Sequence, residues 1–147
     1  MSFIEILNED CTTYKPNYKY DLVIADPPQK GGLNSFNDVS GEEYTEYWLR
    51  NVTRFLTNDS VFIINTIPEY SFKYHELILK NTQLKFFQEV VWVYECGTYN
   101  EHKFTPSHTN FLIYHHGLPK FHSSNIRIQS KRQQMGDKRA DERGRGS

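Results

Sequence analysis

Apolar and polar residues form alternating short blocks along the chain, and these blocks predict strands and helices in turn. Four apolar blocks are rich in β-branched or aromatic residues, which predicts strands at Leu22–Ala25, Ser60–Asn65, Leu84–Tyr94 and Thr109–His115. The third is the longest, and its residues are apolar enough for partial burial on both faces. A short loop separates the last two blocks, so we expect them to be antiparallel neighbours. Phe3–Leu7 is a further short, mostly apolar run that predicts an opening strand.

Two segments between these blocks carry apolar residues at helical spacing. The first, Gly41–Leu56, predicts a helix. Ser40 is its expected N-cap, and Glu43, three residues later, is placed as in a capping box. The second, Tyr70–Asn81, is amphipathic. We expect the core-facing side chains to be Tyr44, Tyr47, Trp48, Val52, Phe55 and Leu56 in the first helix, and Phe72, His75, Leu77, Ile78 and Leu79 in the second. Strands that alternate with helices predict an α/β fold.

A carboxylate follows the first of the central strands. Asp26 comes directly after Leu22–Ala25 and precedes Pro27 and Pro28. Because proline has no N–H to donate, the strand must stop there, and the carboxyl ends of strands are where open α/β sheets bind ligands. The turn offers several acceptors and few donors, which suits an amine with two N–H bonds, such as that of a nucleobase. An ordinary strand end with a proline turn explains these residues equally well.

The order of the motifs resembles the permuted branch of the DNA amino-methyltransferases. After Asp26-Pro27-Pro28, the segments that carry the resemblance are Glu89–Val93, Ser107–Tyr114, Ser130–Gln133 and Gly136–Ala140, and the resemblance extends from Ile4 to Arg145. Enzymes of this family methylate adenine N6 or cytosine N4 in double-stranded DNA, using S-adenosylmethionine. The resemblance implies a partial Rossmann-like three-layer α/β sandwich, with a mixed sheet and an antiparallel final strand.

The resemblance also implies roles for individual residues. Asp26 and the Pro27 carbonyl would accept the hydrogens of the base amine, and Pro28 would stiffen the turn. Gln29 stands where the family has an aromatic residue that stacks on the flipped base, an interaction worth roughly 1–3 kcal/mol. An acid in the first motif position favours adenine N6 as the target. The expected cofactor contacts are Asp10, Asp26 and Asn65, although Asp10 also fits a solvated loop acid and Asn65 a turn residue.

The glycine-rich Phe-x-Gly-x-Gly motif, which binds the cofactor in this family, does not occur in the 147 residues. In the permuted order it would come after the last residue printed. We therefore expect a truncated methyltransferase with weak or no activity alone. The alternatives are one half of a split methyltransferase, whose second chain carries the motif, a non-catalytic DNA-binding remnant, and a frameshifted fragment.

Positive charge is concentrated in the last 30 residues. Residues 118–147 contain eight basic and three acidic side chains, whereas the whole chain has a net charge of −1. We therefore expect a partial catalytic core at residues 1–117 and a basic tail at 118–147 that begins a target-recognition region. The candidate phosphate contacts are Lys103, Arg127, Lys131, Arg132, Lys138 and Arg139, for which a solvated surface is the alternative reading.

Other classes of protein fit the sequence less well. The histidines show no helical i, i+4 pair, so we expect no metal site. Cys11 and Cys96 lack metal or redox spacing and fit reduced thiols. No apolar run is long enough to span a bilayer, and Met1–Asp10 does not resemble a signal peptide. We expect a cytoplasmic protein of a bacterial or phage-infected cell.

Overall fold

One mixed sheet and two helices make up the fold of this chain. The computed structural model describes residues 4–28, 42–95, 97, 101–102, 104–120 and 134–136. The elements are β1 (Tyr20–Ala25), α1 (Glu42–Thr53), β2 (Leu56–Thr66), α2 (Pro68–Asn81), β3 (Lys85–Val93) and β4 (His108–His115). The α/β prediction is confirmed.

The strands lie in the order β1-β2-β4-β3. β1 is parallel to β2, and β4 is antiparallel to both β2 and β3, which confirms the mixed sheet and the reversed last pair. The register places Ile24 beside Ile63, and Ile63 beside Ile113. As predicted, β1 ends at Ala25, immediately before Asp26 and the two prolines.

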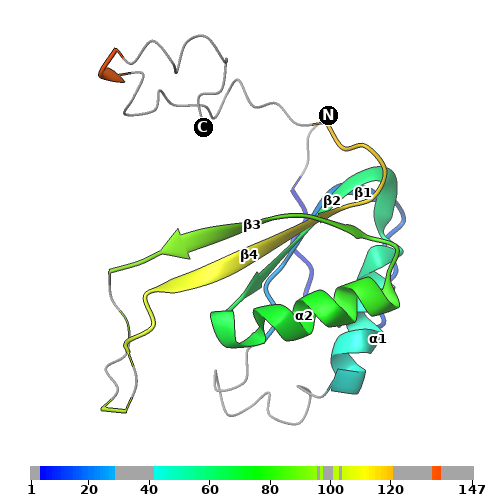
Figure 1. Ribbon diagram of the computed structural model, residues 1–147. Coiled ribbons are helices and arrows are strands. Elements are labelled where there is room, and N and C mark those ends of the chain that lie inside the picture. The colour runs from blue at the N-terminus through cyan, green and yellow to red at the C-terminus, as the bar shows by residue number, and fades with distance from the viewer. Residues whose placement is uncertain are drawn as a thin grey trace.

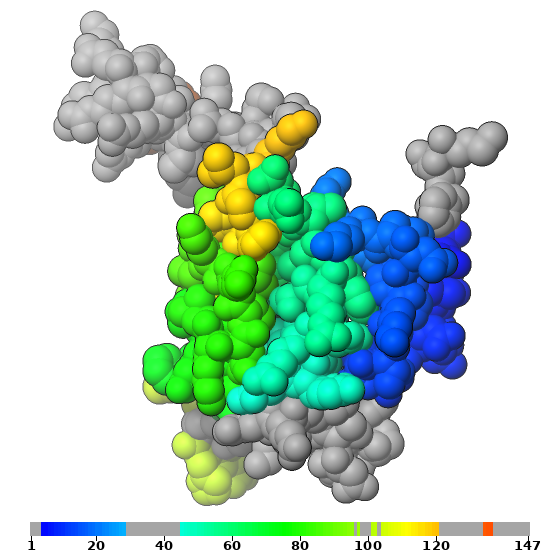
Figure 2. Space-filling model, turned by 90° about the vertical axis from the view of Figure 1, so that its right-hand side faces the viewer, coloured from blue at the N-terminus to red at the C-terminus, as the bar shows by residue number. Residues whose placement is uncertain are grey.

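Both helices cover the same face of the sheet (Figure 1). The side chains on this helix face include Phe62 and Ile64 from β2, with Leu112 and Tyr114 from β4, and all are buried. They pack against apolar side chains of the two helices, namely Trp48, Leu49, Val52, Tyr74, Leu77 and Ile78. Figure 2 shows α2, α1 and the N-terminal segment side by side, and Asn51 of α1 donates to the carbonyls of Cys11 and Tyr14.

The opposite face of the sheet is covered by no helix or strand among the described residues. Large apolar side chains there are accessible to solvent: Leu22 is 51% exposed, Ile24 62% and Trp92 61%. The described elements therefore form two layers of the partial three-layer sandwich that the sequence predicts.

Three strand predictions need correction. The segment Leu84–Tyr94 is predicted to be the longest strand, but β2 is the longest, with 11 residues, because its pairing begins at Leu56 beside Tyr20. The early start of β2 also means that α1 ends at Thr53, before the predicted end at Leu56. The sequence predicts partial burial on both faces of β3, but β3 is exposed along its whole length, because α2 packs mainly against β4 and β2. The strand predicted at Phe3–Leu7 is wrong for residues 4–7, which are exposed and unpaired with the sheet; Phe3 lies outside the described residues.

The predicted helix stripes were too wide. Tyr47 is 60% exposed, Phe72 79% and Leu79 46%, because each helix touches the sheet with a narrow stripe. In α2 that stripe is Tyr74, Leu77 and Ile78, at the i, i+3, i+4 spacing of one helix face. Ser40 and the side chains of Glu43 and Tyr44 lie outside the described residues.

Candidate active site at the carboxyl end of the parallel strands

Polar side chains from three strands meet at one edge of the sheet. Asp26 follows β1, Asn65 lies near the end of β2, and Thr109 lies near the start of β4. Because β1 and β2 are parallel, their carboxyl ends reach the same edge, and the antiparallel β4 begins there. The sequence-predicted residues Asp26 and Asn65 are therefore brought together, and Thr109 joins them.

Hydrogen bonds connect the three side chains one after another, from Thr109 through Asn65 to Asp26. Asn65 Nδ2 donates to Asp26 Oδ1 at 2.9 Å. Thr109 Oγ1 lies 2.8 Å from Asn65 Oδ1 and 2.8 Å from the Thr66 carbonyl oxygen, so its single proton faces two acceptors. Because a carboxylate accepts hydrogen bonds, Asp26 favours the orientation in which Nδ2 of Asn65 points at it, and the Asn65 oxygen then faces the Thr109 hydroxyl.

The burial of these residues increases away from the carboxylate. Asp26 is exposed, whereas Asn65 and Thr109 are half-buried. An accessible carboxylate can meet a ligand, and the half-buried amide holds one of its oxygens in place. The arrangement is therefore suited to accept a hydrogen bond from a polar ligand at the Oδ2 oxygen of Asp26.

Asp10 makes a local structure of its own. Its Oδ1 accepts hydrogen bonds from the backbone N–H and the hydroxyl of Thr12, both at 2.8 Å. These bonds stabilise the charged carboxylate and hold the pKa of Asp10 below its ordinary value. An exposed acid that caps its own turn agrees with the loop interpretation, so the cofactor role of Asp10 remains a prediction.

Thr109 is the member of the site that the sequence reasoning missed. A threonine at the start of a strand is common, and its type alone carries no functional signal. The antiparallel pairing of the last strands was the available clue, because it returns the start of β4 to the edge where Asp26 lies. The remaining predicted site residues, Gln29, Lys103, Arg127, Lys131, Arg132, Lys138 and Arg139, lie outside the described residues.

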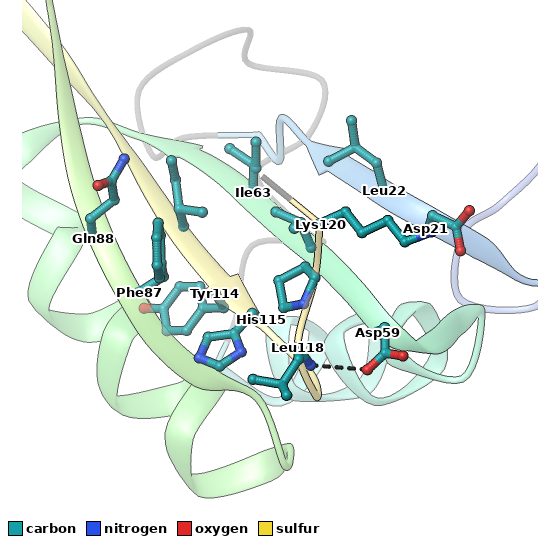
Figure 3. A pocket seen from close by; sticks show the side chains of 13 residues that line it. Asp21, Leu22, Asp59, Ile63, Phe87, Gln88, Tyr114, His115, Leu118 and Lys120 are labelled. Atoms are coloured by element: carbon teal, nitrogen blue, oxygen red, sulfur yellow. Dashed lines mark hydrogen bonds between the residues drawn. The ribbon is translucent and has the colours of Figure 1, made fainter. Parts of the chain in front are cut away.

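A hollow of about 770 Å³ lies on the open face of the sheet (Figure 3). Its floor includes Leu22, Ile63 and Phe87, and Lys120 lies at its rim with Asp21. It is centred near the amino end of β1, whereas Asp26 follows the carboxyl end. The hollow is therefore separate from the three-strand site.

The described residues do not form a complete cofactor site. They supply acceptors at the edge of the sheet, but the chain has no Phe-x-Gly-x-Gly sequence, and the described glycines are isolated ones at positions 97, 117 and 136. Across the described ranges, no group of three or more potential metal ligands gathers, and no helix combines the length and apolar character needed to cross a membrane. Among the described residues, this edge therefore offers acceptors for a polar ligand but no glycine-rich cradle for a nucleoside-type cofactor.

Comparison with known proteins relates most of the chain to one family and one fold. The family model for N6/N4 enzymes, described as DNA methylase, matches residues 20–146. No curated protein matches the chain. The solved M1.HpyAVI–SAM complex has a TM-score of 0.53 and 14% identity, over 71% of this chain and 47% of that one.

A second solved structure shares the same fold. The N-methyltransferase NodS from Bradyrhizobium japonicum WM9 has a TM-score of 0.52 and 6% identity, over 76% of this chain and 58% of that one. At these identities the likeness is one of fold, and it confirms the Rossmann-like prediction. The chain spans about half the length of these structures.

Proposed function

Because this chain belongs to the N6/N4 DNA methylase family, we propose that it forms the base-binding half of an S-adenosylmethionine-dependent DNA methyltransferase. The family membership predicted from the order of the motifs is confirmed by the match over residues 20–146. The observation that carries the proposal is the hydrogen-bonded set of Asp26, Asn65 and Thr109 at the carboxyl end of a parallel strand. This is the edge at which α/β sheets bind their ligands.

The chemistry follows from the nature of the target. The exocyclic amine of a base is a poor nucleophile because its lone pair is delocalised into the ring. In the proposed complex, Asp26 Oδ2 accepts one hydrogen of the amine and the Pro27 carbonyl accepts the other, which localises the lone pair and directs it outward. Asn65 holds the carboxylate through Oδ1, and Pro28 stiffens the turn. S-adenosylmethionine, when bound, supplies the methyl group.

Adenine N6 is the target that we favour, because the motif begins with an acid, Asp26. The flipped base would come from double-stranded DNA, whose phosphates would meet the basic tail at residues 118–147, beyond the catalytic core at 1–117. Gln29 would replace the ring that stacks on the base. Bacterial or phage-infected cytoplasm is the setting that we propose.

The cofactor cradle is the part of the site that these 147 residues do not supply, because no Phe-x-Gly-x-Gly motif occurs among them. A second polypeptide that carries the motif is one source of it that we propose to test. On this basis the chain alone has weak or no activity.

Nucleoside mass spectrometry of DNA from a methylation-free host tests the proposal. We expect no methylated base with the chain alone, N6-methyladenine when the second polypeptide is added, and its loss with Asp26→Ala. N4-methylcytosine would preserve the mechanism and correct the target base. DNA binding that is unaffected by S-adenosylmethionine and by Asp26→Ala, with no methylated base in any combination, would overturn the proposal in favour of a non-catalytic remnant.

A further inference from the structure

Two aromatic rings continue the row of polar side chains at the carboxyl edge of the sheet. In the register of the antiparallel strands, Phe111 on β4 lies opposite Asn65, and Trp92 on β3 lies opposite Thr109. Asn110 is buried against α2, so its neighbours Thr109 and Phe111 point to the open face, the side of the sheet away from the helices. The row therefore runs from a carboxylate, through an amide and a hydroxyl, to two rings.

Trp92 combines an accessible ring with a fixed position. Its side chain is 61% exposed. Its ring centroid lies 5.9 Å from that of Phe111, with the two planes inclined by 40°, at a separation typical of attractive aromatic pairs. Figure 1 shows the end of β3 beside the start of β4, so the indole lies at the edge of the sheet that also carries Asp26. A large flat surface is thus presented to solvent next to the candidate active site.

The distance across the sheet decides which base this surface can meet. Neighbouring strands lie about 4.8 Å apart, and β2 and β4 separate β1 from β3, so Trp92 is about 14 Å from Asp26 across the sheet. A single base held by its amine at Asp26 does not span that distance, whereas the next nucleotide of the same DNA strand can reach the indole.

The chemistry of an extruded base supplies the partner for this surface. When a base leaves the stack, each of its neighbours loses a stacking contact and has a face uncovered. Aromatic side chains stack on such faces with little regard to the identity of the base, because every base has a π-face. The turn at Asp26 supplies no ring of its own, since its sequence is Asp-Pro-Pro-Gln. A base beside the target therefore fits Trp92.

We propose that Trp92 is a stacking platform for a base that flanks the methylated one, and that Phe111 is the ring that holds the indole in place. The inference rests on the proposed function and adds a second contact to the same DNA strand. Asp26 selects an amine, and Trp92 accepts any base at the neighbouring position.

Tryptophan fluorescence tests the platform on the chain itself. One probe is a short single-stranded oligodeoxyadenylate, and the other is the same oligonucleotide with every nucleotide except the central one abasic, so both carry the same phosphates and only the first has flanking bases. We expect the first probe to quench the fluorescence of Trp92 and the second to leave it unchanged. Trp48 is buried in the core, so loss of the quenching in Trp92→Leu assigns the signal. Equal quenching by the two probes, or none by either, would overturn the proposal.

Affinities for the two probes, measured by fluorescence anisotropy, give the size of the effect. Trp92→Leu should weaken binding of the oligodeoxyadenylate about five- to a hundredfold, because stacking on one base is lost, and should leave the affinity for the abasic probe unchanged. Phe87→Leu is the matched control and should change neither affinity, since Phe87 is 52% exposed on the same face, at the other end of β3. Circular dichroism shows that both variants fold. Similar losses in both variants, or no loss in Trp92→Leu, would contradict the platform.

Methylation by the complete enzyme separates this proposal from the proposed function. Quenching that depends on flanking bases, with no methylated base formed, would refute the proposed function alone. Methylation with a KM for DNA that Trp92→Leu leaves unchanged would refute the stacking platform alone.

Discussion

The two faces of the sheet are built from the same kinds of residue and lie in opposite environments. On the helix face, Phe62 and Ile64 are fully buried. One position away on the same strand, Ile63 is only half-buried, and its neighbour Ile24 on β1 is 62% exposed. Burial here depends on what packs against a face, because the apolar character of the side chains is similar on both.

The difference separates the residues that maintain the fold from those available for function. The helix face closes the core between the sheet, α1 and α2. The open face leads at its carboxyl edge to Asp26. Substitutions on the helix face should therefore change stability, and substitutions on the open side should change binding or catalysis.

The largest expected effect is on the helix face. Phe62→Ala should lower the free energy of unfolding by about 3–5 kcal/mol, because it leaves a cavity in a fully buried site. Leu22→Ala, on the half-exposed open face, should cost about 1 kcal/mol or less. Urea denaturation followed by tryptophan fluorescence measures both. Equal losses would show that the open face is already buried in the isolated chain.

The next effect is catalytic. If Asp26 has the role that we propose, Asp26→Ala should lower the methylation rate of the complete enzyme about 100- to 1,000-fold, because it would remove the acceptor for the reacting amine. Asp21→Ala is the matched control, since Asp21 is an exposed acid at the other end of β1 that accepts a hydrogen bond from Thr57. Single-turnover methylation assays compare the two. Similar losses of methylation rate in both variants would mean that removal of any negative charge from β1 or its end slows the reaction, and that Asp26 has no special role.

A smaller effect should come from the positioning residue Thr109. Thr109→Val keeps the shape of the side chain but removes the hydroxyl that lies against Asn65 Oδ1 and the Thr66 carbonyl, so the Asn65 amide beside Asp26 loses one of its contacts. A hydrogen bond of this kind contributes about 0.5–1.5 kcal/mol, or roughly three- to tenfold in kcat. Thr109→Ser should restore kcat, and KM for DNA should stay constant. A serine variant as slow as the valine variant would argue against the hydroxyl.

The smallest effect concerns a polar contact on the helix face. The Tyr114 hydroxyl lies 2.9 Å from His75 Nδ1, so Tyr114→Phe should cost about 0.5–1.5 kcal/mol at neutral pH. Burial raises the pKa of Tyr114 above its ordinary value of 10.0. The folded state thus favours the neutral phenol. The stability that Tyr114 contributes in this way is complete below pH 10 and is lost as the pH rises toward the pKa of the folded state.

Urea midpoints between pH 8 and pH 11 (about the range around the ordinary tyrosine pKa) measure this dependence. The phenylalanine variant should lose less stability than the native chain over that range. Some alkaline sensitivity should remain, because burial also raises the pKa of Tyr74 to about 12. Parallel curves for the two proteins would contradict the assignment to Tyr114.

Local sequence chemistry predicted much of the fold. Pro27 and Pro28 lack an N–H, so the end of β1 could be placed at Ala25 from the sequence alone. The order of the motifs likewise indicated the family. Boundaries that depend on distant partners were less accurate: α1 ends early because Leu56 pairs with Tyr20, and residues 4–7 are mostly apolar but form no described strand.

The sequence by itself determined that an acid follows a buried-type strand at a proline turn, since those constraints act between adjacent residues. The tertiary structure alone decided that Asn65 and Thr109 meet Asp26, because their contact depends on the register of strands far apart in the chain. It also decided which apolar face the helices cover. Consecutive apolar residues make both sides of a strand favour burial, and only packing against the helices distinguishes the face that holds the fold from the face left open.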